Sequence, residues 1–248
     1  MAHIADPRSS LGFQSSGRGC AGTHRRSRAG RAALAAAGAA ALLTACAPPS
    51  IQMQPTELST VRHAAPVYST HVAKPTFLVM TMGRAAFGAF GAIAGLKAGQ
   101  RWIVRYHVPN PSGLVENNLA AALQQRDQLN HVTAGAHGLK TDHVADLRAT
   151  FGQRGLVLDV SRGSWQMLYY PLSPSHLKTM YVLRARLVDL ASGKTLWQHV
   201  CKVETRHERT APTVSELKAR NGALLKQITS KMTQRCAVQL AASFGSAS

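Results

Sequence analysis

One stretch near the start of the chain, from His24 to Ser50, constrains the protein more than any other. It begins with a cluster of arginines, continues as an uncharged run of Ala and Leu from Ala32 to Ala45, and ends in small residues before a cysteine. Basic, apolar and small residues in this order are the layout of a secretory signal peptide. The apolar run has 14 residues, whereas a transmembrane helix needs roughly 20. We therefore expect residues 1–45 to direct export and to be removed.

The end of this stretch, Leu43-Thr44-Ala45-Cys46, resembles the lipobox of bacterial lipoprotein precursors: an aliphatic residue, two small residues and a cysteine. The resemblance implies that the Cys46 thiol receives a diacylglycerol, that the chain is cut before Cys46, and that the new amino group is acylated, for example with palmitate. Ala47 follows, and in this family retention at the inner membrane is usually signalled by Asp at that position. The resemblance therefore implies an outer-membrane protein, anchored by lipid, whose domain faces the periplasm.

The organisation of the rest of the chain follows from the expected cut before Cys46. Residues 1–23 form a long polar region for a signal peptide, which raises the alternative of an over-extended start. Residues 46–74 contain Pro, Ser, Thr and His with little periodicity, so we interpret them as a flexible tether. Residues 75–248 are then expected to form one periplasmic domain. The mature chain of 203 residues is long enough to bury a hydrophobic core.

The mature chain stays strongly basic without its leader. The precursor has 29 Lys and Arg against 11 Asp and Glu, and removing residues 1–45 leaves 23 against 10, a net charge of +13. A basic surface favours anionic partners such as phospholipid headgroups or acidic envelope polymers. Nucleic acid is not expected, because the chain is exported and carries no recognition motif for it. The alternative is a generally basic, solvated surface with no dedicated ligand.

Two cysteines remain once the leader and the lipid site are accounted for. Cys20 lies in the leader and Cys46 is the expected lipid site, so Cys201 and Cys236 are left. Both fall on sides of their elements that we expect to face the core, and an oxidising compartment favours a disulfide between them. The alternative is two separate buried thiols that pack as small apolar groups. Neither belongs to a CxxC pair, so zinc binding has no support.

A stripe of glycines follows the first apolar strand candidate, Thr76–Met82. Gly91, Gly95 and Gly99 recur every four residues, so on a helix they form one narrow, smooth side. Stripes of this kind drive helix association in membranes, which makes an inserting or pore-lining segment one interpretation.

Basic residues argue against insertion of this segment. Arg84, Lys97 and Arg101 leave fewer than the roughly 18 uncharged residues that a span requires. We therefore expect a helix whose small residues pack closely on a sheet inside the domain.

Other elements are indicated by caps and by alternation. The expected elements are a helix from Pro111 capped by Asn110, a short helix at 144–151, strands at 156–169, a hairpin of 181–188 with 195–203, and a last helix starting with a Thr213–Glu216 capping box. This order predicts an α+β fold: an antiparallel sheet with a C-terminal hairpin, and helices packed mainly on one face.

The hairpin sequence LVDLASGKTLWQHVCKV and the cysteine on the last helix resemble the periplasmic domains of uncharacterised proteobacterial envelope lipoproteins. More loosely, they are similar to assembly and transport-auxiliary lipoproteins of the envelope. The resemblance covers the final third of the chain and carries over no functional residues. On the hairpin, Arg184 and Arg186 alternate with apolar residues, so we expect their face to be free for a partner.

Motifs of catalysis are absent from the sequence, which contains no GxSxG, HExxH, Walker loop, GxGxxG or paired CxxC. We therefore expect no catalytic residues, no metal and no cofactor. His131, His137 and His143 are six residues apart, a spacing that matches no common metal site. Asp142 and Asp146 lie four apart, and we interpret them as capping and surface residues rather than as an acid/base pair.

The function favoured by these observations is a non-catalytic binding or scaffolding component of the cell envelope. Its expected partners are the membrane, through the N-terminal lipid, and another envelope protein or an anionic envelope polymer. Two alternatives stay open: a periplasmic enzyme whose site is too irregular for motif recognition, and an oligomeric channel component that uses the glycine stripe.

Overall fold

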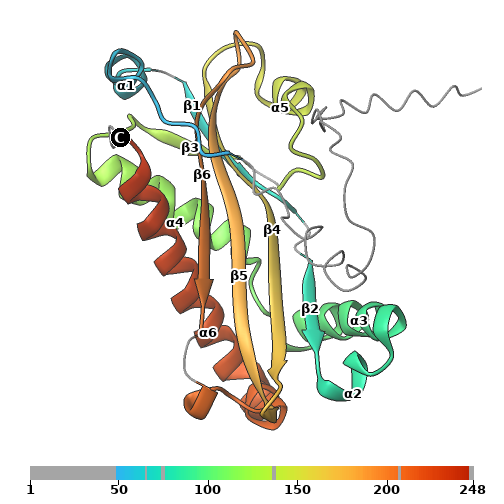
Figure 1. Ribbon diagram of the computed structural model, residues 1–248. Coiled ribbons are helices and arrows are strands. Elements are labelled where there is room, and N and C mark those ends of the chain that lie inside the picture. Colours follow the sequence, from blue (N-terminus) through green and yellow to red (C-terminus); the bar gives the residue numbers. More distant parts are fainter. Residues whose placement is uncertain (1–48, 65, 74–75, 136–137, 206–207, 246–248) are drawn as a thin grey trace, which may run out of the picture. The chain divides into compact units, whose positions relative to one another are not determined.

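A six-stranded sheet flanked by helices makes up the described part of the protein (Figure 1). The structure is a computed structural model that describes residues 49–64, 66–73, 76–135, 138–205 and 208–245. The helices are α1 (Pro55–Arg62), α2 (Met82–Ala85), α3 (Gly88–Tyr106), α4 (Pro111–Gln125), α5 (Val144–Phe151) and α6 (Val214–Ser243), with a 3-10 turn at Glu208–Thr210. The strands are β1 (Val67–His71), β2 (Phe77–Met80), β3 (Val132–Ala134), β4 (Leu156–Tyr170), β5 (Ser173–Asp189) and β6 (Thr195–Glu204).

The sheet is mixed, so the predicted antiparallel sheet is correct only in part. Its strand order is β3-β1-β4-β5-β6, with β2 also paired to β4. The three long strands β4, β5 and β6 are antiparallel, as the predicted hairpin required. Strands β1 and β2 run parallel to β4 along successive parts of one edge, and β3 runs parallel to β1. Helices stand between these strands along the chain, and such crossovers return the chain in the same direction.

The interpretation of residues 46–74 as a flexible tether is wrong for their described part. Helix α1 and strand β1 both belong to the fold, and β1 lies between β3 and β4. Ile51 also forms a bridge with Gln198 on β6. The domain therefore begins close to Pro49 rather than at residue 75. The sequence of β1 is VYSTH, whose buried Ser69 and Thr70 hide the alternation that identifies a strand.

Helices cover both faces of the sheet, with the larger core on one of them. Helices α4 and α6 pack against each other and against the sheet (Figure 1), and the main core holds Leu158 of β4 and Leu183 of β5 together with residues of both helices. A smaller core on the opposite side joins Leu147 of α5 to Val157 and Val188. Neighbouring residues of a strand point to opposite faces, which is why Val157 and Leu158 belong to different cores.

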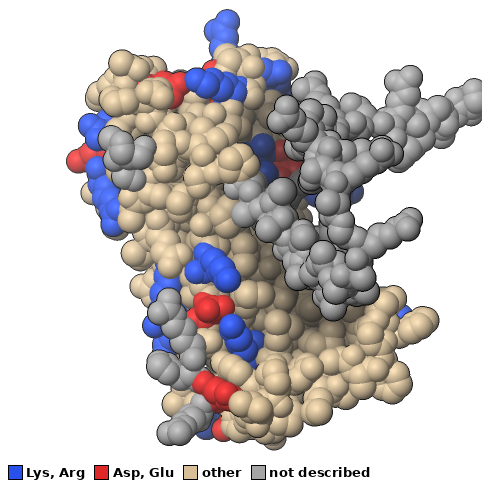
Figure 2. All heavy atoms as spheres, in the orientation of Figure 1, with Lys and Arg blue, Asp and Glu red and all other residues tan. Residues whose placement is uncertain are grey.

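Helix α3 contacts β2 through its glycines, as the sequence predicted. A Cβ atom on Gly99 would overlap with the carbonyl group of Phe77, and one on Gly95 would lie 3.0 Å from the carbonyl oxygen of Val79. Only glycine permits this approach of helix backbone to strand backbone. The surface over α2 and α3 is mostly uncharged on the side shown in Figure 2. Among the described residues, none of the helices is both long and apolar enough to cross a membrane.

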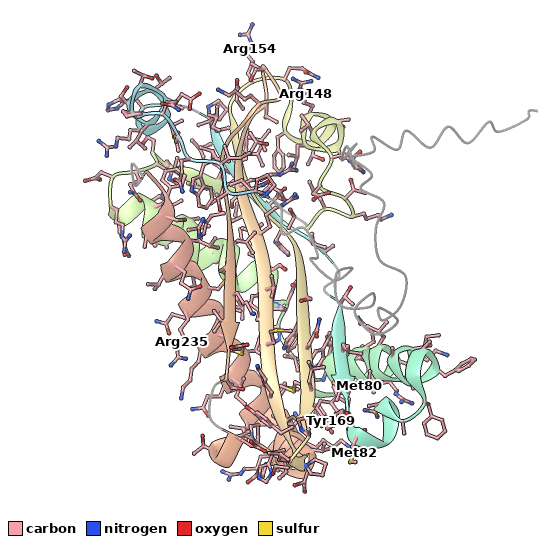
Figure 3. The ribbon with its side chains drawn as sticks, viewed as in Figure 1. Met80, Met82, Arg148, Arg154, Tyr169 and Arg235 are labelled. Atoms are coloured by element: carbon pink, nitrogen blue, oxygen red, sulfur yellow. A yellow bond between two sulfur atoms is a disulfide. The ribbon has the colours of Figure 1, made fainter. Side chains whose placement is uncertain are left out.

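The contact lies at the edge of β2 that faces away from β4. The backbone N–H of Trp165 on β4 donates to the carbonyl oxygen of Thr76, so the carbonyls of Phe77 and Val79 point to the opposite edge. Arg84 of α2 also donates from Nη1 to the Val79 carbonyl oxygen at 3.0 Å. Figure 3 shows Met80 and Met82 where β2 leads into α2. Helices α2 and α3 thus cover a strand edge that would otherwise be open to pairing with another chain.

The C-terminal helix is fixed to the sheet by the predicted disulfide. Cys201 of β6 is bonded to Cys236 of α6, with 5.4 Å between their Cα atoms. The predicted capping box is also present, because Thr213 and Glu216 exchange their hydrogen bonds at the start of α6. Gly222 has a φ of +71° within a break at residues 219–222. A Cβ atom there would lie 2.7 Å from Cβ of Tyr106.

Replacing Gly99 with alanine should destabilise the domain. The added methyl group must displace the Phe77 carbonyl, and overpacking of this kind typically lowers the free energy of unfolding by about 1–3 kcal/mol. Gly83→Ala is the matched control, since a Cβ atom at Gly83 meets nothing within 4 Å. Urea unfolding followed by circular dichroism measures both changes. Equal free energies of unfolding for the two variants would show that α3 does not pack closely against β2.

Candidate functional site

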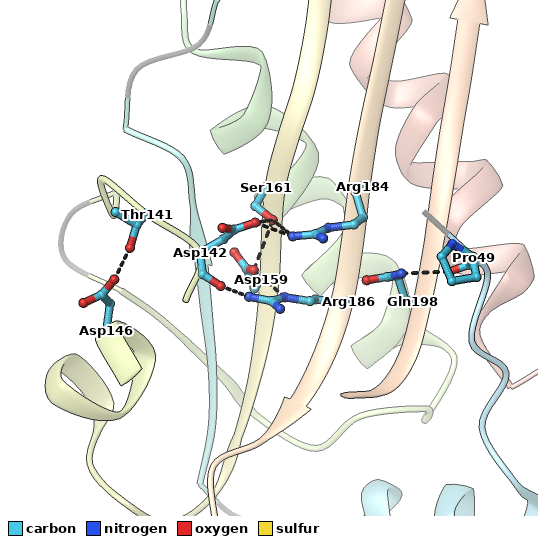
Figure 4. Close-up of polar contacts among 9 residues, drawn as sticks. All are labelled: Pro49, Thr141, Asp142, Asp146, Asp159, Ser161, Arg184, Arg186 and Gln198. Carbon is cyan, nitrogen blue, oxygen red and sulfur yellow. Dashed lines mark hydrogen bonds and ion pairs between the residues drawn. The ribbon is translucent and has the colours of Figure 1, made fainter. Parts of the chain in front are cut away.

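The residues predicted to bind a partner, Arg184 and Arg186, lie in a network of buried ion pairs on β4 and β5 (Figure 4). Arg186 donates from Nε to Oδ2 of Asp159 at 2.8 Å, and also donates to the backbone carbonyl of Asp142. Arg184 forms an ion pair with the Asp142 carboxylate and donates to Oγ of Ser161 at 3.0 Å. Ser161 in turn donates to Asp159 at 3.1 Å. Two guanidinium groups and two carboxylates therefore balance one another.

The prediction that this arginine face is free for a partner is wrong. The side chain of Arg186 is 10% exposed and that of Arg184 is 14% exposed. Alternation correctly placed both side chains on the side of β5 away from the main core, but the loop that carries Asp142 covers that side. Burial raises the pKa of the Asp159 carboxyl, and the Arg186 guanidinium acts against this rise. The ionised state of Asp159 thus depends on Arg186 staying in place.

A second buried polar cluster joins β1 to α4. The carboxylate of Glu116 contacts Nδ1 of His71 at 2.5 Å and accepts a hydrogen bond from Oγ of Ser69 at 2.6 Å. Gly113 and Gly138 leave room for the His71 ring, because Cβ atoms there would lie 3.2 and 3.0 Å from its Nε2. The serine donates to the carboxylate rather than to the imidazole, so the three groups lack the geometry of a nucleophile activated by a base. Their arrangement fixes the helix to the strand.

A polar pocket of about 590 Å³ lies beside the ion-pair network. Residues from the start of α4, the loop before α5, β4 and β5 line it, including Ser112, Lys140, His143, Trp165 and Tyr181. Burial raises the pKa of the Tyr181 hydroxyl, while the Ser112 side chain lowers it in part. The hydroxyl is therefore neutral at ordinary pH. A small ligand in this pocket would meet a lysine, a histidine and an aromatic wall, which is a set suited to binding.

Metal ligands do not gather in the described part of the chain, where no group of three or more His, Cys, Asp or Glu side chains could hold an ion. Of the three histidines considered in the sequence, His137 lies outside the described residues. Cys46 lies outside them as well, so its lipidation stays a prediction. Asp142 takes part in the network, and Asp146 accepts a hydrogen bond from Thr141 (Figure 4).

Sequence reasoning missed the carboxylate partners of the network. Asp142 and Arg184 are 42 residues apart, and Asp159 and Arg186 are 27 apart. Only the pairing of β4 with β5 places Asp159 opposite Arg186. One signal was available, because a strand as apolar as 156–160 with an aspartate inside it needs a cation to accompany that charge.

Comparison with solved structures finds distant likeness to PelC and to several bacterial lipoproteins. The PelC dodecamer from Paraburkholderia phytofirmans is 9% identical, with a TM-score of 0.33 over 73% of this chain and 89% of that chain. Lipoprotein GNA1162 from Neisseria meningitidis is 17% identical, with a TM-score of 0.25 over 66% and 98% of the two chains. A minor lipoprotein from Acinetobacter baumannii is 14% identical, with a TM-score of 0.30 over 54% and 88%. No protein-family profile matches the chain, and no curated protein matches it.

Asp159→Ala should destabilise the domain strongly, because it leaves Arg186 charged and buried without its carboxylate. Breaking a buried ion pair in this way costs about 3–5 kcal/mol of unfolding free energy. The double variant Asp159→Leu, Arg186→Met removes both charges and should recover most of that loss. Lys194→Ala is the control, because its pair with Glu57 is at the surface and should be worth less than about 1 kcal/mol. Denaturant unfolding of the natural chain and the three variants measures these differences in unfolding free energy, and a mild effect of Asp159→Ala would mean that the network is not structural.

Proposed function

We propose that this chain is a lipid-anchored lipoprotein of the outer membrane, whose domain faces the periplasm and acts as a non-catalytic binding or scaffolding component of the envelope. The observation that carries the proposal is the sequence Leu43-Thr44-Ala45-Cys46 after a basic and apolar leader. Two residues, Ala47 and Pro48, lie between Cys46 and Pro49, the first described residue, so three Cα–Cα steps join the lipid site to it. Such a link spans at most about 11 Å, so the lipid would hold the domain close to the membrane surface.

The non-catalytic part of the proposal is supported by how the polar groups are used. Asp142, the carboxylate beside the polar pocket, is engaged by Arg184. His71 and Glu116 hold α4 on β1. The serines beside these groups, Ser161 and Ser69, donate to carboxylates and not to an imidazole, so neither has the geometry of a nucleophile activated by a histidine. The enzyme alternative therefore gains no observation in its favour. The channel alternative loses its basis, because the glycine stripe that it required is packed on β2 inside the domain.

Partners of this protein are proposed to be another envelope protein or an anionic envelope polymer. The mature chain carries a net charge of +13, which raises the local concentration of acidic partners. The polar pocket supplies Lys140 and His143 for their recognition.

Cys46→Ala should give an uncut precursor that incorporates no labelled palmitate, because the Cys46 thiol is the group that receives the diacylglycerol. Cys20→Ala is the matched control, and it should be processed and labelled like the natural chain. Ala47→Asp should be lipidated but retained at the inner membrane on sucrose-gradient fractionation. Continued labelling of the Cys46→Ala variant would refute the lipid anchor. Unchanged fractionation of Ala47→Asp would instead count against sorting to the outer membrane.

Photo-crosslinking in intact cells tests the binding role. A benzophenone amino acid at Lys140, beside the polar pocket, should give a discrete crosslinked product with one envelope component. The same group at Arg154, exposed in the loop before β4 (Figure 3), is the control and should give none. If neither position crosslinks and the purified protein turns over a substrate, the scaffold proposal fails in favour of the enzyme.

A further inference from the structure

Large apolar side chains project into solvent from α2, α3 and the turn between them. Phe90 is 82% exposed, Phe87 72%, Met82 54% and Ile93 52%, and Val104 near the end of α3 is 72% exposed. We call these five residues the α3 patch. They are exposed because the glycines of α3 occupy the side that packs on β2.

The α3 patch is a group of neighbours rather than a scatter of single residues. Phe90 and Ile93 are three residues apart on α3, so they lie along one side of the helix. Phe87, in the turn just before α3, and Met82 on α2 precede them. Single exposed apolar residues are ordinary on a protein surface, whereas a contiguous group marks an interaction site.

Cations accompany the α3 patch, and no acidic residue is near them along the sequence. Lys97, Arg101 and Arg105 are exposed along the second half of α3, and the sequence contains no Asp or Glu from residue 58 to residue 115. Lys218 of α6 adds another positive charge beside this half of the helix, with its Nζ 5.5 Å from the centre of the Trp102 ring. Among the described residues, none of the three helix cations has an ion-pair partner.

We infer that the α3 patch docks on the surface of an anionic phospholipid bilayer. Its apolar side chains would enter the boundary between headgroups and acyl chains, and its cations would contact the lipid phosphates, as in helices that lie in the membrane interface. The helix does not span the membrane. A second copy of the chain is a poorer occupant, because a two-fold contact would bring the same cations of both copies together.

The inference rests on the proposed lipid anchor only in one respect, which is the identity of the membrane on which the α3 patch docks. Acyl chains at Cys46 would keep the domain at the surface, so a weak patch is sufficient for docking there. The patch itself belongs to the domain, whose core consists of residues between Met53 and Phe244. A mature chain without leader or lipid therefore contains the whole core and is suited to the test.

Flotation of this lipid-free chain with vesicles tests the docking. The natural chain should float with vesicles of phosphatidylglycerol and phosphatidylethanolamine, and not with vesicles of phosphatidylcholine alone. The double variant Phe90→Ser, Ile93→Ser should lose flotation, and Arg101→Glu, Arg105→Glu should weaken it by about ten-fold or more. Leu172→Ser, at a residue 93% exposed on the β4–β5 turn, and Arg235→Glu, at an exposed position of α6 (Figure 3), are the matched controls and should bind normally.

Three results would overturn the inference. The first is failure of the natural chain to float, and the second is equal flotation of the patch variants and the controls. The third is a dimer in sedimentation that the Phe90→Ser, Ile93→Ser variant abolishes while vesicle binding is absent, which would assign the patch to a second copy. Circular dichroism checks that each variant is folded, and the charge variant decides the outcome if the serine variant is not. Palmitate labelling at Cys46 is independent of all three results, so failure of the anchor and failure of the patch are distinguishable.

Discussion

The contact of α3 with the free edge of β2 determines which side of this helix is buried and which side chains it exposes to solvent. Gly95 and Gly99 let the helix backbone reach the outward carbonyls of the strand, and the helix then protects an edge that could otherwise pair with another chain. Because the small residues of α3 pack against β2, the large side chains of the helix lie on the solvent-exposed side. The glycine stripe, which suggested insertion into a membrane, thus packs inside the domain. The opposite side of the same helix is the surface that we propose to dock on the membrane.

The charged residues also divide into a buried group and an exposed group. On β4 and β5, two arginines are neutralised by two carboxylates in the buried network, so they add nothing to the field that a partner meets. On α3 the cations are exposed and no acid is near them in sequence. The excess positive charge of the mature chain is therefore displayed partly along α3, beside exposed apolar side chains. Charge and apolar surface together suit an anionic bilayer better than either would alone.

Sequence patterns predicted correctly the elements that depend on neighbouring residues or on residue type. The hairpin of β5 and β6, the Thr213–Glu216 capping box and the pairing of Cys201 with Cys236 follow from alternation, cap chemistry and the count of remaining thiols. Strand β1 could not be recognised, because its buried Ser69 is matched to Glu116, a residue 47 positions away. The parallel edge and the partners of Arg184 and Arg186 depend in the same way on which distant segments meet. The exposure of Phe90 follows only once the glycine side of α3 is known to be buried.

The most direct test of this account is the environment of a nitroxide label at position 90 in the lipidated protein on native membranes. A Phe90→Cys variant carries the label, and a Leu172→Cys variant is the reference for a position in water. The account predicts that collisions with oxygen increase and collisions with a water-soluble nickel complex decrease at position 90, relative to position 172. Equal nickel accessibility at the two positions would show that α3 does not touch the bilayer and would contradict the account.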